Sequence, residues 1–167
     1  MEVTDLFHRI QVDLLLHGEQ YGFVIKAVTV AVLCYVGVTD LRTFKIQNES
    51  VLLLAALYLL YALIFRSWYE VLSNVILAVA VLSLLLWFYT RGVLGGGDVK
   101  LLPVACLWVG SHCALLFSML LFVLIVFHLV IVRLGWARTR IVRGRHAIPY
   151  GPSVVGAMIG CILLGCL

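Results

Sequence analysis

Long uninterrupted apolar runs are the feature of this sequence that most limits its possible folds. A helix needs about 20 apolar residues to cross the roughly 30 Å hydrocarbon core of a bilayer. Hydrophobic residues make up 64% of the chain and charged residues only 12%, so water cannot be its main solvent. The apolar runs are Tyr21–Thr39, Ser50–Phe65, Val71–Tyr89, Val99–Leu134 and Ile148–Leu167. This pattern predicts a polytopic membrane protein.

The fourth run is too long for one crossing. Gly110, Ser111 and His112 interrupt it and are expected to divide it in two, with an unusually short fourth segment at Val99–Val109. The sequence therefore predicts an all-α fold of about six transmembrane helices. Residues 21–167 are expected to form one membrane unit whose core is the contact between its helices.

Residues 1–20 differ from the rest because acidic residues interrupt them. Leu6, Ile10 and Leu14 recur every four residues, which is typical of a short amphipathic helix lying on the membrane surface. No basic stretch precedes an apolar core here, so we do not interpret this arm as a cleavable signal peptide.

Basic residues indicate how the chain is oriented. Most of them lie in or beside three loops that should share one side of the membrane. The basic residues of these loops are Arg42, Lys45, Arg91, Lys100, Arg133, Arg138, Arg140, Arg143 and Arg145. The positive-inside rule places these loops in the cytoplasm and both termini outside. Topology thus accounts for the net charge of +4, and no motif of a nucleic-acid-binding protein is present.

The five cysteines, Cys34, Cys106, Cys113, Cys161 and Cys166, all lie in or beside apolar runs. None forms a Cys-x-x-Cys pair, and no histidine stands at zinc-finger spacing. We expect them to be small buried or lipid-facing residues, and we expect no metal and no cofactor.

Asp40 and Asp98 are the acidic residues that most need an explanation. Asp40 ends the first apolar run, where the helix dipole disfavours an anion, unless it is a loop carboxylate paired with Arg42. Asp98 follows Gly95, Gly96 and Gly97 at the start of a helix, where it could also be a simple N-cap. Two carboxylates sharing one proton across a water molecule can supply both the base and the acid for amide hydrolysis.

Other polar groups near the spans are open to simpler interpretations. Glu49 is expected to be a structural residue of a first helical turn, and Glu70 a loop partner of Arg66. Lys100 could tune the aspartates or simply extend from a helix end to the interface. For His128 we expect a neutral hydrogen bond between helices and no link to the aspartates. The segment Pro149-Tyr150-Gly151-Pro152 predicts irregular backbone at the membrane edge, either lining a cleft or forming a plain junction.

Three motifs, in this order, resemble the prepilin peptidases of type IV pilus and related secretion systems, which are membrane aspartic peptidases with a Gly-x-Gly-Asp motif. Residues 40–48, from Asp40 to Asn48, are similar to the first catalytic motif of that family, and Gly95–Leu101 to the second. Pro149–Pro152 is similar to the segment that opens its last helix. One departure is Gln47, where the family usually has proline before the asparagine.

The resemblance implies that Asp40 and Asp98 are the catalytic pair and that Gly95, Gly96, Gly97, Lys100, Asn48, Pro149, Tyr150, Gly151 and Pro152 shape the site. It implies removal of the leader from prepilin-like substrates at the cytoplasmic face of the bacterial inner membrane. It also implies no N-methylation, because the four-cysteine insertion of the longer enzymes is missing. The implied partners are the substrate, the bilayer, and pilus or secretion machinery.

Two other functions compete with this interpretation. In a small proton- or ion-coupled transporter, the two aspartates would relay ions, although such groups usually lie near the bilayer midplane. In a non-catalytic membrane subunit of a pilus or secretion assembly, the pair would be vestigial. Replacing either acid would then leave function intact.

Overall fold

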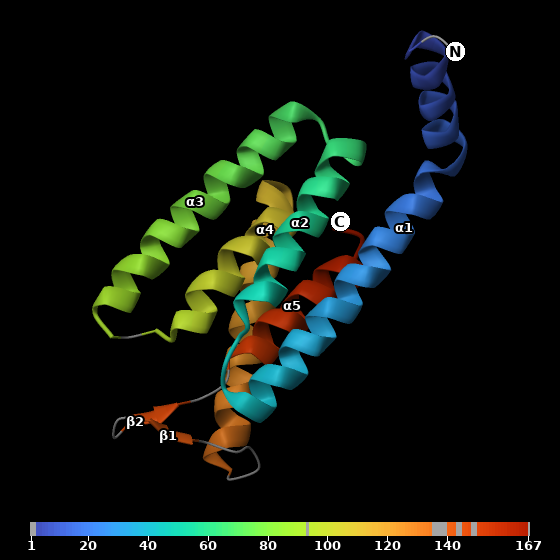
Figure 1. Cartoon of the computed structure of the whole chain (residues 1–167). Helices are drawn as coiled ribbons and strands as arrows, with labels where there is room; N and C mark the ends of the chain where they lie inside the picture. Colours follow the sequence, from blue (N-terminus) through green and yellow to red (C-terminus); the bar gives the residue numbers. More distant parts are fainter. Residues whose placement is uncertain (1–2, 93, 135–139, 143–144, 148–149, 167) are drawn as a thin grey trace.

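The computed structural model describes the backbone of residues 3–92, 94–134, 140–142, 145–147 and 150–166, and the side chains of residues 18–92, 94–134 and 150–166. These residues form a bundle of five helices with one short hairpin at its end (Figure 1). The helices are α1 (Val3–Thr43), α2 (Asn48–Phe65), α3 (Trp68–Thr90), α4 (Gly96–Arg133) and α5 (Gly151–Leu163). Strands β1 (Arg140–Val142) and β2 (Arg145–Ala147) pair antiparallel.

The lengths and surfaces of the helices are those of a membrane protein. Residues 18–43 of α1, the whole of α2 and α3, and α4 counted over its full 38 residues are long and apolar enough to cross a membrane. Large apolar side chains point outward, as Leu63, Trp68 and Leu115 do at 82%, 80% and 70% exposure. With 13 residues, α5 is about 20 Å long and too short to cross unaided.

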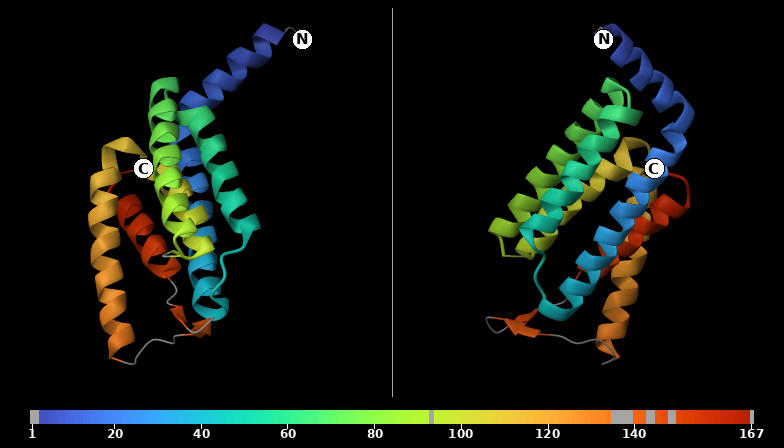
Figure 2. Two further views of the ribbon diagram at one scale, coloured as in Figure 1. Left: turned by 90° about the vertical axis from the view of Figure 1, so that its left-hand side faces the viewer. Right: turned by 45° about the vertical axis from the view of Figure 1, so that its right-hand side comes forward.

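The structure has five helices among its described residues, so the expected count of six is not confirmed. The expected fourth and fifth segments are both part of α4, but the expected division between them is confirmed, because Gly110 (φ 73°, ψ 173°) departs from helical geometry there. In a straight helix Asp98 and His128 would lie about 45 Å apart. Both nevertheless interact electrostatically with Asp40, so the chain reverses at Gly110. Figure 2 shows the two arms of α4, residues 96–109 and 111–133, running in opposite directions.

Asn74 of α3 holds this reversal. It is 3% exposed, and its Nδ2 donates to the hydroxyl of Tyr58 at 3.2 Å. Its Oδ1 accepts from the backbone N–H of Ser111 at 3.1 Å. A Cβ on Gly110 would lie 2.9 Å from the same Oδ1. Glycine is therefore required at the turn for two reasons, its positive φ and the close approach of Asn74.

Gly110→Ala is expected to destabilise the bundle by about 2–4 kcal/mol, because it adds backbone strain to a clash with a buried polar group. The measurement is the Tm of the detergent-solubilised protein. Gly165→Ala is the matched control, since Gly165 also has a positive φ (77°) but no atom within 4 Å of its Cβ position. A Tm for Gly110→Ala no lower than that of Gly165→Ala would contradict the role given to Asn74.

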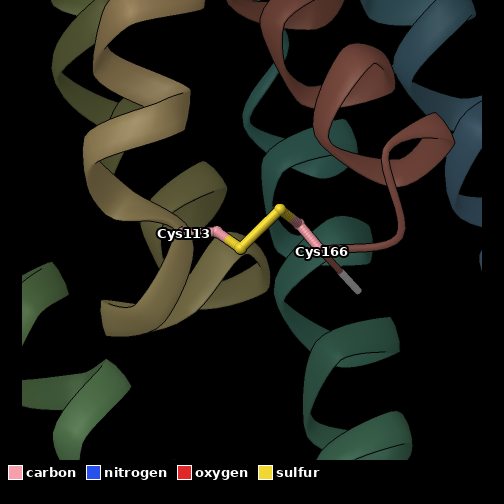
Figure 3. Close-up of a disulfide and its surroundings, with 2 residues drawn as sticks. All are labelled: Cys113 and Cys166. Carbon is pink, nitrogen blue, oxygen red and sulfur yellow. A yellow bond between two sulfur atoms is a disulfide. The ribbon is translucent and has the colours of Figure 1, made fainter.

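A disulfide joins Cys113, at the start of the second arm of α4, to Cys166, just beyond α5 (Figure 3). Their Cα atoms are 6.0 Å apart. The expectation that all five cysteines are merely apolar residues is thus wrong for these two. It failed because the partners are 53 residues apart in sequence and meet only when α5 packs back along α4. Cys34, Cys106 and Cys161 are free.

The N-terminal arm and the arginine-rich loop have two further features. The arm and the first span form one continuous helix, α1, because no proline separates them and the helix accommodates Gly18. The side chains of residues 1–17 lie outside the described residues, so the membrane-surface role of the arm stays a prediction. The all-α expectation is confirmed for the bundle, and the structure adds one two-stranded hairpin in the arginine-rich loop.

Candidate active site

A cavity of about 360 Å³ lies at one end of the bundle, where α1 ends and α4 and α5 begin. Its lining combines the two aspartates with the segments that resemble catalytic motifs; the lining residues are Asp40, Phe44, Lys45, Ile46, Gly95, Gly96, Gly97, Asp98, Lys100 and Tyr150. Asp40 and Asp98 come from helices far apart in the sequence. The tertiary structure therefore brings together the two acids that the sequence singled out.

Asp40 lies in the last turn of α1 and is only 5% exposed. Its Oδ2 accepts a hydrogen bond of 2.9 Å from the backbone N–H of Gly151, the first residue of α5. An anion is disfavoured at the C-terminus of its own helix but favoured at the N-terminus of another. The start of α5 thus explains why an aspartate can stand here. Among the described residues no ion pair with Arg42 is present, so that alternative is not supported.

Gly151 permits this contact because it has no side chain. A Cβ at this position would lie 2.5 Å from Oδ2 of Asp40 and 2.9 Å from its Cγ. Real Cβ atoms essentially never approach an oxygen so closely. The glycine is therefore required by the proximity of α1 to α5.

Asp98 is the third residue of α4, in its first turn, and is partly buried. The N-cap of α4 is Gly95, so Asp98 is not the cap residue that the sequence left open. Asp98 and Asp40 interact electrostatically across the shared cavity. Gly97 lets the start of α4 approach Ile46, whose side chain would lie 3.1 Å from a Cβ there. The glycine-rich segment thus packs against the connection between α1 and α2.

Lys100 and Asn48 form a clamp beside the aspartates. The Nζ of Lys100 donates to Oδ1 of Asn48 at 2.7 Å, which ties the first turn of α4 to the first residue of α2. Gln47 is the N-cap of α2 with φ −73° and ψ 136°. This φ is one that proline also adopts, so the departure at Gln47 leaves the local turn intact.

The remaining expected site residues are at the start of α5. Tyr150 is the N-cap of α5 and lines the cavity, and Pro152 lies in the first turn, where proline is well tolerated. The prediction for Pro149 lies outside the described residues.

Two expectations for acidic residues elsewhere are confirmed. Glu49 is in the first turn of α2, and Arg66 pairs with Glu70 at 3.3 Å.

Four residues of the region were not identified from the sequence as site residues, and these are Phe44, Lys45, Ile46 and His128. Phe44 lines the cavity with a φ of 55°, and its N–H bonds to the carbonyl of Asp40 at 2.9 Å. Nothing in the sequence signals a left-handed residue there, because glycine usually ends a helix in this way. His128 interacts electrostatically with Asp40, which corrects the expectation that it has no link to the aspartates. The reversal at Gly110 brings it back to this end.

The arrangement provides two carboxylates in a cavity with room for several water molecules. The Asp40 carboxylate accepts a hydrogen bond from the backbone N–H of Gly151, and Asp98 lies in the first turn of α4. Such a pair can accept a proton from water and donate one to a leaving group. Among the described residues there is no cluster of three or more His, Cys, Asp or Glu side chains able to hold a metal ion.

Comparison with protein families gives one match. Residues 27–134 match the type IV leader peptidase family. The matched range includes both aspartates, the Asn48–Lys100 clamp and the glycine-rich segment, and it ends before the hairpin and α5. No curated protein and no solved structure matches the chain.

Proposed function

Because the chain belongs to the type IV leader peptidase family, we propose that it is a membrane aspartic endopeptidase that removes the leader from prepilin-like precursors. Asp40 and Asp98 are its catalytic pair. The observation that carries the proposal is the shared cavity, in which two carboxylates from separate helices interact electrostatically. An isolated structural aspartate would need neither the second acid nor the cavity.

In the proposed reaction, the ionised carboxylate takes a proton from a water molecule as the water oxygen attacks the scissile carbonyl carbon. The protonated carboxyl polarises the carbonyl oxygen. As the C–N bond breaks, the proton that the pair took from water is donated to the departing amide nitrogen. The pair titrates as a unit, so neither residue is assigned permanently as acid or base. One oxygen of Asp40 is held by Gly151, which fixes the orientation of the carboxylate towards the reaction.

Two observations support a cytoplasmic position for the aspartates. The loops rich in Lys and Arg are connected to the same ends of α1, α3 and α4 as the aspartates, which agrees with the positive-inside rule. The Cys113–Cys166 disulfide lies beside the reversal at Gly110, at the opposite end of the helices. Disulfides persist in oxidising compartments, so this end fits the outer face of the bacterial inner membrane.

We further propose cleavage without N-methylation. The longer enzymes that the chain resembles carry a four-cysteine cytoplasmic insertion. Here the three connections at this end are residues 44–47, 91–95 and 134–150. None of them contains a cysteine.

The proposal is tested by co-expressing the chain with a prepilin-like substrate in a host that has no other leader peptidase. We expect the substrate to become shorter on a gel, and mass spectrometry of its new N-terminus to show no added methyl group. The double variant Asp40→Asn/Asp98→Asn is the control for cleavage by host enzymes. An uncleaved substrate beside a correctly inserted chain would favour the assembly-subunit function instead.

A further inference from the structure

The second arm of α4 packs on α5 in a regular antiparallel register. Leu120 and Leu124 approach the glycines of α5, with 3.2 Å from Leu120 Cδ1 to the Cβ position of Gly160 and 3.1 Å from Leu124 Cδ1 to that of Gly156. Each step of four residues along α4 matches four residues along α5. Continued by one more step, this register would place His128 opposite Pro152, which follows the residue that binds Asp40.

His128 is an unusual residue to find at this point. Its Nε2 is buried and has no hydrogen-bond partner among the described residues. The interhelical hydrogen bond expected from the sequence is therefore absent at this nitrogen. An unpaired polar atom in an apolar bundle destabilises the fold, because the hydrogen bond it had with water is not replaced. A functional role for the imidazole would explain why the cost is tolerated.

Asp40 is the charged group that acts on this imidazole. The two side chains interact electrostatically, Asp40 from α1 and His128 from α4. The first turn of α5 contributes Gly151, Pro152 and Ser153, none of which can ionise.

The other ionisable groups at this end have other surroundings. Asp98 acts on Asp40 from the first arm of α4, and both Tyr150 and Lys45 line the cavity that contains Asp40. Lys100 is bonded to Asn48, and Arg133 is exposed.

We propose that His128 is a positioning residue of the aspartate pair, which favours the carboxylate form of Asp40 when its imidazole carries a proton. This inference rests on the proposed function, because it concerns the charge of the same pair. A cation near one of two coupled carboxylates makes the first ionisation easier. His128 thereby extends activity of the pair towards lower pH.

The first test is the pH dependence of leader cleavage for the wild type and for His128→Gln. Without the cation, the carboxylate form of Asp40 is less favoured, so the acidic limb of the profile is expected to move about 0.5–1 pH unit higher. His112→Gln is the matched control, since His112 is exposed near the other end of the same arm. Its profile is expected to match that of the wild type.

The second test does not depend on activity. Dicyclohexylcarbodiimide adds to protonated carboxyl groups, so labelling of Asp40, measured by mass spectrometry across pH, reports its protonation. The labelling midpoint is expected to move in the same direction and by a similar amount in His128→Gln, and to stay unchanged in His112→Gln. This holds whether or not a substrate is cleaved.

The outcomes separate the two proposals. The role of His128 would be overturned if His128→Gln left the pH midpoint of carbodiimide labelling at Asp40 unchanged. It would also be overturned if this variant lost cleavage equally at every pH. Cleavage that survives Asp40→Asn would overturn the proposed function, while carbodiimide labelling would still decide whether His128 controls Asp40. Detergent-extracted yield and elution volume confirm that each variant is folded.

Discussion

Replacing either Asp40 or Asp98 with asparagine is expected to lower the rate of leader cleavage by about 100-fold or more, since general acid–base catalysis contributes at least that factor. Asparagine keeps the size of the side chain but cannot ionise or hold the shared proton. Both changes remove a carboxylate from the cavity, and because the side chain keeps its size, the helices are expected to stay in place. The measurement is the initial rate of leader removal, normalised to the amount of inserted protein.

Glu49→Gln is the matched control for this pair of variants. Glu49 is an exposed acid in the first turn of α2, at the same end of the bundle, and it does not line the cavity. Its replacement makes the same change in charge and is expected to leave the rate within about twofold of wild type. Near-normal cleavage by Asp40→Asn or Asp98→Asn would make the vestigial pair of an assembly subunit the better explanation.

Gly151→Ala is expected to reduce cleavage by about 10- to 100-fold, although residue 151 itself neither accepts nor donates a proton in the proposed reaction. The new Cβ would meet Oδ2 of Asp40 at 2.5 Å, so Asp40 or the start of α5 must move. A displacement of about 1 Å at a catalytic group is enough for a loss of this size. The effect should fall on kcat rather than on KM, because Gly151 contacts Asp40 but does not line the cavity.

Gly37→Ala separates this effect from a general sensitivity of the helix contact. Gly37 is also at the contact between α1 and α5, but the nearest atom to its Cβ position is in Val155, at an ordinary 3.6 Å. We expect this variant to cleave normally. If Gly151→Ala were as active as Gly37→Ala, the hydrogen bond between Gly151 and Asp40 would have no role in catalysis.

Together these variants describe a site built where three helix ends meet. The end of α1 supplies Asp40, the start of α4 supplies Asp98, and the start of α5 supplies the N–H that holds Asp40. A carboxylate at the end of one helix is stabilised by the start of another. The same contact therefore fixes the geometry of the site and the packing of α5.

Local features were sufficient to predict much of this protein. Apolar runs define the helices, because crossing a bilayer requires a minimum length of apolar chain. Asp40 stood out because its own helix disfavours an anion at that position, and Asp98 because three glycines precede it. Arg66 and Glu70 pair as their spacing of four residues predicts. Each of these inferences uses residues that are close together in the sequence.

Only the tertiary structure decided which distant residues meet. The sequence predicted a break at Gly110 but not its contact with Asn74. The disulfide joins residues 53 apart, and His128 reaches Asp40 because α4 turns back. Hydropathy cannot reveal such contacts, because it reports how a side chain partitions between lipid and water and not which neighbour it finds. The sequence alone thus determined the spans and the two acids, whereas the packing of α5 against α1 and α4 determined how those acids are held.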